Sequence, residues 1–168
     1  MSFLCRFEGP TTRPAASDIS ADPDVLESQD VAIIRACEIL STTDARFFVQ
    51  GFGLDDWNLD VKYDLSIFLE QTSDVLMGLH ARDDSQIDLY SQGVERILTF
   101  HPYEESVRIE CLSGTSWKPD PSEEDITLDD LISMLSQLVT SFSQTVEGID
   151  GHAARIEPFS SWLRGVLW

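Results

Sequence analysis

One apolar stripe near the C-terminal end of the sequence constrains the fold more than any other feature. Between Thr127 and Gly148, apolar residues recur every three or four positions: Leu128, Leu131, Leu135, Leu138 and Phe142. This spacing is typical of a helix that buries one face against a core. Thr127 can cap the first turn, and Asp129 and Asp130 suit the positive end of the helix dipole. The pattern predicts a long amphipathic helix that ends near Gly148.

Two earlier segments have the same helical periodicity. The first runs over residues 30–42, with Ser28 or Asp30 able to cap its start. The second runs over residues 65–80 behind a candidate cap at Asp64, and the polar residues 72–74 could divide it into two pieces.

Five further segments have the composition of strands: 45–53, 57–63, 86–90, 94–100 and 106–112. The clearest alternation is at 57–63, where every second residue is apolar. Short turns join the last three segments, which predicts an antiparallel meander. We therefore expect an α+β fold, with a mostly antiparallel sheet of about five strands and helices packed on one face.

The chain of 168 residues has the size of one domain. Residues 1–28 contain three prolines and little periodicity beyond a short apolar start, which favours a flexible N-terminal arm. Residues 29–168 then form a single α+β domain, and the aromatic tail from Ile156 onward is expected to pack against it.

Charge narrows the choice of partner. The chain has 30 acidic and 11 basic residues, a net charge of −19, which disfavours contact with nucleic acid or an anionic membrane. A basic protein is the natural complement, although the same acidity would also keep a protein soluble without any partner. The widely spaced cysteines, the absence of a membrane-spanning apolar run and the absence of a signal-like start favour the cytoplasm.

A search for catalytic and metal-binding patterns found two weak candidates. Cys111 and His101 could form a thiol–imidazole pair, but a buried structural cysteine is the favoured interpretation. His80 with Asp83 and Asp84 could hold a metal ion, but solvated loop charges fit better. Phosphate-binding glycine motifs and a nucleophile elbow are missing. We expect a protein that is not an enzyme and uses no cofactor or metal.

Acidic residues gather beside two tryptophans, and this is the strongest indication of a binding surface. Trp57 lies within one group, over residues 55–70, and Trp117 directly precedes the other, over residues 118–130. Acids around an exposed aromatic side chain suit an interface with a basic protein. The other interpretation is that the tryptophans are core residues; it is favoured for Trp57 and stays open for Trp117. The candidate partner-binding residues are Asp55, Asp56, Trp117, Asp120, Glu123, Glu124 and Asp125.

The middle of the chain resembles acidic immunity proteins of bacterial polymorphic toxin systems. The features are an aromatic strand over 47–53, the Trp-Asn-Leu-Asp-Val run at 57–61, a helix start at Asp64-Leu65, then a strand meander and a late apolar helix. The resemblance spans about residues 30–145. It implies a small cytoplasmic inhibitor that neutralises a cognate toxin stoichiometrically through acidic surface, and many such toxins are basic nucleases.

Two alternatives to an inhibitor stay open. The chain could be a self-associating structural or adaptor module without catalytic activity, with the apolar tail as the contact of a homodimer. It could also be an enzyme whose site has no recognisable motif.

Overall fold

The computed structural model describes residues 3–15, 18–21 and 23–167 of the chain. The helical elements are η1 (Pro23–Leu26), α1 (Gln29–Leu40), α2 (Asp64–Ala81), α3 (Leu128–Ile149), η2 (Ala153–Arg155) and α4 (Phe159–Leu163). The strands are β1 (Leu4–Glu8), β2 (Arg46–Gln50), β3 (Ser85–Leu89), β4 (Arg96–Tyr103), β5 (Ser106–Ser113) and β6 (Glu123–Thr127). The predicted combination of helices with antiparallel strands is confirmed.

The strands form a two-stranded and a four-stranded sheet, so the prediction of one sheet of about five strands is not confirmed. β1 pairs with β2 in one sheet, and the other has the order β3-β4-β5-β6; every pairing is antiparallel. The predicted meander accounts for β3, β4 and β5. The sheets stay separate because the chain leaves β2 through a tight turn, in which Gly51 and Leu54 form an isolated bridge, instead of continuing into a neighbouring strand.

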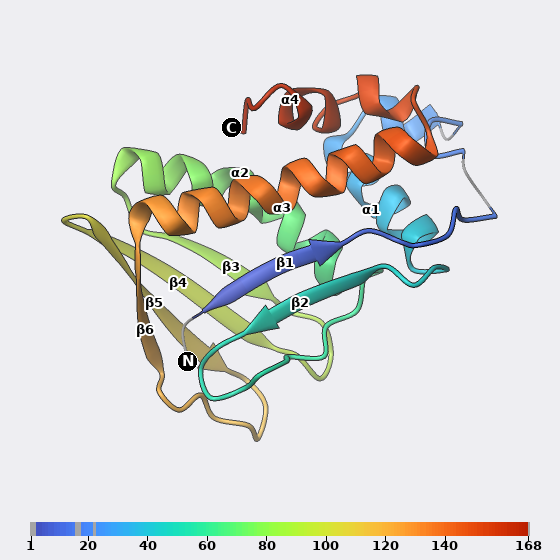
Figure 1. Ribbon diagram of the computed structural model, residues 1–168. Coiled ribbons are helices and arrows are strands. Elements are labelled where there is room, and N and C mark those ends of the chain that lie inside the picture. The colour runs from blue at the N-terminus through green and yellow to red at the C-terminus, as the bar shows by residue number, and fades with distance from the viewer. Residues whose placement is uncertain (1–2, 16–17, 22, 168) are drawn as a thin grey trace.

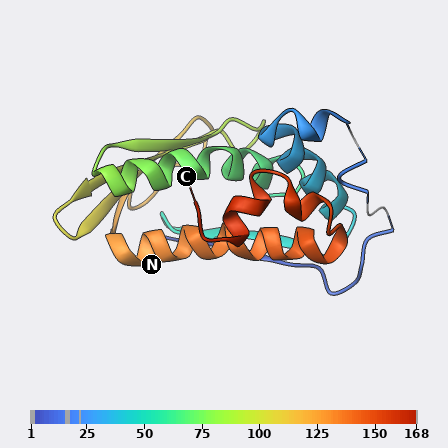
Figure 2. The ribbon, with the colours of Figure 1, turned by 90° about the horizontal axis from the view of Figure 1, so that it is seen from above.

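Two long helices lie over the four-stranded sheet (Figure 1). α2 packs against β3 and β4, while α3 packs against β5, β6 and also β1. Seen from above, α2 and α3 run alongside each other, and the short α4 packs against α3 (Figure 2). Strand residues that point toward these helices, such as Ile109 and Cys111 in β5, are fully buried, whereas Arg108 and Leu112 are exposed on the other face.

The three predicted helices are confirmed, with small differences at their ends. The Ser28 hydroxyl accepts a hydrogen bond from the Val31 N–H, and the Thr127 hydroxyl accepts one from the Asp130 N–H. α2 is not divided at residues 72–74, because the Thr72 hydroxyl donates to the Phe68 carbonyl and stays buried within the helix. The C-terminal tail is pinned by buried aromatic side chains, as expected.

Residues 57–63 do not form the strand that their alternation predicts. Trp57, Leu59 and Val61 are buried, as a strand would bury them, but Asn58 has a φ of 53° and interrupts the extended backbone. The Trp57 N–H donates to the Val49 carbonyl, and Tyr63 already precedes the first turn of α2. An irregular segment can thus produce period-two burial without a ladder of hydrogen bonds.

The N-terminal segment differs from the flexible arm expected over residues 1–28. Leu4–Glu8 is β1, and Phe3, only 1% exposed, packs its ring against Phe52 and Phe100 at centroid distances of 6.2 and 6.4 Å. Ile19 is also fully buried. Five residues of alternation are too few to stand out in a sequence beside the proline-rich stretch that follows. Of the described residues in this segment, Phe3, Cys5, Phe7, Ile19 and Val25 belong to the core, and most of the others are exposed. Residues 1–2, 16–17 and 22 lie outside the described residues.

The buried Phe3 ring provides a test of this N-terminal docking. We expect Phe3→Ala to lower the free energy of unfolding by about 3 kcal/mol, because it leaves a cavity where both sheets meet. Leu26→Ala, at an exposed site in η1, is the matched control and should change it by less than about 0.5 kcal/mol. Equal denaturant midpoints for Phe3→Ala and the unsubstituted protein would contradict a structural role for the segment.

Candidate functional site

The segment from Gly51 to Trp57, here called the 51–57 segment, joins the two sheets. The Phe52 N–H donates to Glu124 Oε1 in β6 at 2.7 Å, and the Phe52 carbonyl accepts from the Asp120 N–H at 3.1 Å. Gly53 has a φ of 88°, and a Cβ there would lie 2.5 Å from the Asp120 carbonyl oxygen. Only glycine allows so close an approach. The loop before β6 is therefore held against the end of β2.

A buried guanidinium lies between two tryptophan rings beside this segment. Arg96, at the start of β4 and 7% exposed, lies 4.4 Å from the Trp57 ring centroid and 4.3 Å from that of Trp117. Its Nε and Nη1 find no hydrogen-bond acceptor among the residues that the structure describes. Burial lowers the pKa of Arg96, against the opposing influence of Cys111 and Asp64. The two rings are thus the main stabilising contacts of this charge.

The two tryptophans differ in exposure. Trp57 is buried, in line with the core interpretation, whereas Trp117 is half-buried and its ring contacts the Arg96 guanidinium. Trp117 therefore combines a structural contact on one side of its ring with partial access to solvent.

In β6, neighbouring acidic residues of the second predicted group point to opposite faces of the strand. The sequence indicated a loop here, but Glu123 and Asp125 point outward and Glu124 points inward, where it is 8% exposed. Arg108 Nε lies 3.5 Å from a Glu123 oxygen and 3.2 Å from an Asp125 oxygen. Glu124 does not belong to the surface, because its carboxylate serves the 51–57 segment. The sequence shows no apolar alternation at this strand, because the acidic Glu124 occupies its buried side.

The remaining predicted acids meet at one edge of the molecule. The contacts of Phe52 and Gly53 bring the loop with Asp55 and Asp56 next to the loop with Asp120, beside Trp117. We call Asp55, Asp56, Asp120 and Trp117 the acidic edge. Asp56 lies 3.8 Å from Arg46, while Asp55 and Asp120 form no ion pair with any other residue in the described part of the chain.

The candidate thiol–imidazole pair does not form. Cys111 lies on the buried face of β5, and burial raises the pKa of its thiol to about 12. His101 belongs to the opposite face of the sheet, where its Nδ1 lies 2.9 Å from Asp84 and its Nε2 lies 3.8 Å from Glu110. A thiol on one face and an imidazole on the other cannot exchange a proton directly.

The candidate metal ligands do not gather either. Within residues 3–15, 18–21 and 23–167, no group of three or more His, Cys, Asp and Glu side chains is arranged to hold a metal ion. Asp84 contacts His101, as described above.

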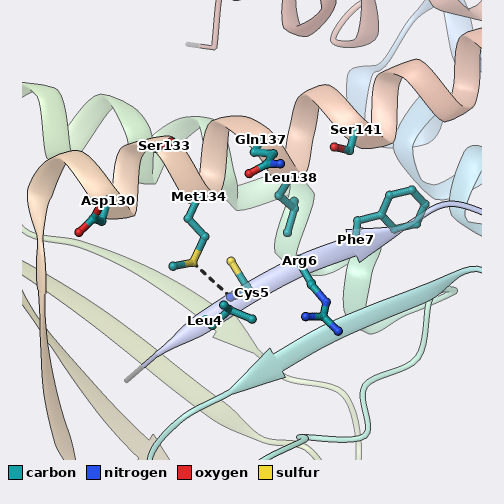
Figure 3. Close-up of a pocket in the computed structure, with 10 residues that line it drawn as sticks. All are labelled: Leu4, Cys5, Arg6, Phe7, Asp130, Ser133, Met134, Gln137, Leu138 and Ser141. Carbon is teal, nitrogen blue, oxygen red and sulfur yellow. Dashed lines mark hydrogen bonds between the residues drawn. The ribbon is translucent and has the colours of Figure 1, made fainter. Parts of the chain in front are cut away.

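A cleft of about 430 Å³ separates β1 from α3 (Figure 3). The Cys5 N–H, on the edge of β1 that faces away from β2, donates to Met134 Sδ at 3.2 Å, and Gln137 and Ser141 of α3 border the same space. Burial raises the pKa of the Cys5 thiol to about 12, so it is not a nucleophile at neutral pH. This cleft offers polar groups of a helix and a strand edge, without an activated side chain.

A larger cleft, of about 870 Å³, opens between α1, the start of α2 and the turn that joins β3 to β4. We call it the α2 cleft. Three acids line it, Asp60, Asp64 and Glu70, together with Lys62. Burial, aided by the nearby charge of Asp30, raises the pKa of Glu70 to about 7. The sequence groups these three acids with Asp55 and Asp56 in one acidic stretch, but it does not show the cleft, because the lining residues lie in three separate stretches of the chain.

No protein-family model matches this chain, and neither the curated proteins nor the solved structures include one with significant similarity to it. In the part of the chain that the structure describes, none of the helices combines the length and the apolar composition needed to cross a membrane.

The inward carboxylate of β6 generates one prediction. Glu124→Ala should lower the free energy of unfolding by about 2 kcal/mol, because the buried Phe52 N–H loses its acceptor. Its neighbour Glu123 is exposed, and Glu123→Ala should change the stability by no more than about 0.5 kcal/mol. Denaturant unfolding of both variants tests this, and similar midpoints would contradict the assigned role of Glu124.

The raised pKa of Glu70 generates a second prediction. The folded state holds the Glu70 proton up to about pH 7, whereas the unfolded chain releases it near pH 4.5, so this group lowers stability as the pH rises between these values. Glu70→Gln should therefore be more stable than the unsubstituted protein at pH 8, by about 1 kcal/mol after allowance for partial exposure, and equally stable at pH 4.

Melting temperatures recorded from pH 4 to pH 8 would measure this effect. Glu147→Gln, at an exposed position of α3, is the control and should show no such divergence. A difference for Glu70→Gln that stays constant over the whole pH range would contradict the prediction.

Proposed function

We propose that this protein is an immunity-type inhibitor that binds a cognate bacterial toxin stoichiometrically in the cytoplasm and neutralises it. The observation that carries the proposal is the acidic edge, where two acidic loops that are distant in the sequence adjoin the half-buried Trp117. An aromatic side chain surrounded by carboxylates supplies both an anchor and a steering field for a basic protein.

Electrostatics support a basic partner. A net charge of −19 repels nucleic acid and attracts a positively charged surface over distances of about one Debye length, roughly 8 Å at physiological salt. Asp55 and Asp120 make no ion pair with another described residue, so their charges remain available to a partner. A basic nuclease is the toxin class that we favour, because an acidic inhibitor can occupy a surface that otherwise binds phosphate.

A capture experiment followed by an activity assay tests the function. The tagged protein is incubated at low salt with a lysate of its own source, and the retained proteins are identified by mass spectrometry. We expect one partner in 1:1 ratio, eluted by rising salt, whose toxic or nucleolytic activity is lost when one equivalent of this protein is added. Recovery of the bait alone as a larger species in size exclusion would favour a self-associating module instead.

The acidic edge yields a kinetic prediction. Asp55→Lys combined with Asp120→Lys should slow association with the captured partner by about tenfold at low salt, because the reversed charges weaken steering. Glu147→Lys is the control, because it changes the net charge in the same direction at a remote exposed site. It should slow association far less than the double substitution does. Association rates from surface-based kinetics that are unchanged at low salt would contradict the role of the edge.

A further inference from the structure

The α2 cleft contains a buried carboxylate oxygen without a donor. Asp64, the first residue of α2, is 2% exposed and lines the cleft. Its Oδ2 accepts a hydrogen bond from the Asp60 N–H at 2.9 Å, while its Oδ1 is buried and has no hydrogen-bond partner anywhere in the described chain. Leaving a buried charged acceptor unsatisfied costs about 1–3 kcal/mol or more, so a donor supplied from outside would be strongly favoured here.

Arg96, the buried cation that interacts electrostatically with Asp64, does not supply that donor. Burial lowers the pKa of Arg96 and the charge of Asp64 opposes this change, but no hydrogen bond joins the two side chains among the described contacts. The Arg96 guanidinium instead contacts the rings of Trp57 and Trp117. Lys62, the cation that lines the cleft, has its Nζ 3.5 Å from Glu38 and over the Tyr63 ring. Lys62 is therefore held in other contacts, and the Arg96 guanidinium contacts two aromatic rings without a hydrogen bond to Asp64 among the described residues.

The walls of the cleft combine aromatic surface with negative charge. Tyr63 and Tyr90, which are 57% and 64% exposed, stand at the mouth, and half-exposed Ile34 adds apolar surface. Asp60 and Glu70 line the cleft with Asp64. A flat cation that stacks on tyrosine and donates several hydrogen bonds fits these walls better than a compact ammonium group does.

We propose that the α2 cleft receives an arginine side chain from a basic protein partner, with its guanidinium donating to Asp64 Oδ1 and lying against the exposed tyrosines. This inference rests on the proposed function and names a contact that the acidic edge does not include. The lining of the cleft begins at Asn58, two residues after Asp56 of the acidic edge, so the two sites are neighbours along the chain. Arginine is also the cation most enriched among residues that dominate binding energy at interfaces.

A titration with a small probe tests the cleft without any partner. Nα-acetyl-arginine amide is added to the isotope-labelled protein, and backbone amide shifts are followed by NMR. We expect saturable shifts concentrated at residues 58–70 and 90–94. The matched ligand Nα-acetyl-citrulline amide has nearly the same shape but no charge, and it should give shifts at least about tenfold weaker at equal concentration.

Two variants link the binding to the named carboxylates. Asp64→Asn should weaken the arginine probe about tenfold or more, and unchanged spectra outside the cleft would show that it remains folded. Glu70→Lys, which removes no backbone contact, should also abolish binding at the same probe concentration. Glu147→Lys is the control with the same charge change far along α3 and should bind as the unsubstituted protein does.

Several results would overturn the proposal. They are shifts spread over all acidic surfaces, equal binding of the citrulline probe, equal binding of Nα-acetyl-lysine amide, or full binding by Asp64→Asn and Glu70→Lys. If a captured partner binds these two variants as tightly as the unsubstituted protein, the arginine pocket fails while the inhibitor function stands. If no partner is captured, the inhibitor function fails, and the probe titration still decides whether the cleft binds arginine.

Discussion

The two-stranded sheet of β1 and β2 is too small to be stable alone, and the contacts that attach it to the other sheet therefore determine the fold. The 51–57 segment makes several of these contacts. Its Phe52 backbone bonds to the side chain of Glu124 and to the amide of Asp120, and the Phe52 ring packs on Phe3. α3 then covers β1 from above, with Phe142 against Phe7 at 5.4 Å. Hydrogen bonds and aromatic packing thus act on the same junction.

Arg96 belongs to the same junction, and its contacts with two aromatic rings explain why a positive charge can lie inside this protein. Its guanidinium is enclosed by Trp57 from the 51–57 segment and Trp117 from the loop before β6. A cation without a bonded carboxylate is costly to bury, but two ring faces offset part of that cost. The arrangement connects β4 to both loops, so the charge and the aromatic rings depend on one another for their positions.

The structural junction and the proposed binding surface share residues. The turn that bonds to β6 also presents Asp55, and the loop that supplies Asp120 also carries Trp117. The α2 cleft begins a few residues farther along, at Asn58 and Asp60. Because backbone contacts fix the two loops against each other, the positions of these loops are set before a partner binds. This pre-organisation supports an inhibitor that works by covering a basic surface.

Local pattern was sufficient for part of this structure. The 3.6-residue periodicity and the Thr127 cap predicted α3, and period-two alternation with short turns predicted β3, β4 and β5. These elements are long or regular enough to be recognised from their own sequence pattern, without knowledge of their neighbours in the fold. Charge composition likewise needs no structure, and the prediction of a basic partner rests on it alone.

Tertiary contacts decided what the pattern could not. β1 is short, β6 turns an acid inward, and residues 57–63 alternate without forming a strand, because each of these segments depends on partners far away in the chain. The same dependence governs the site. Which acids are exposed, that the loop with Asp120 packs against Phe52 and Gly53, and that one Asp64 oxygen is buried without a described partner are consequences of packing between distant segments. The sequence by itself determined the periodic elements and the sign of the surface charge, whereas only the folded chain decided where that charge is available.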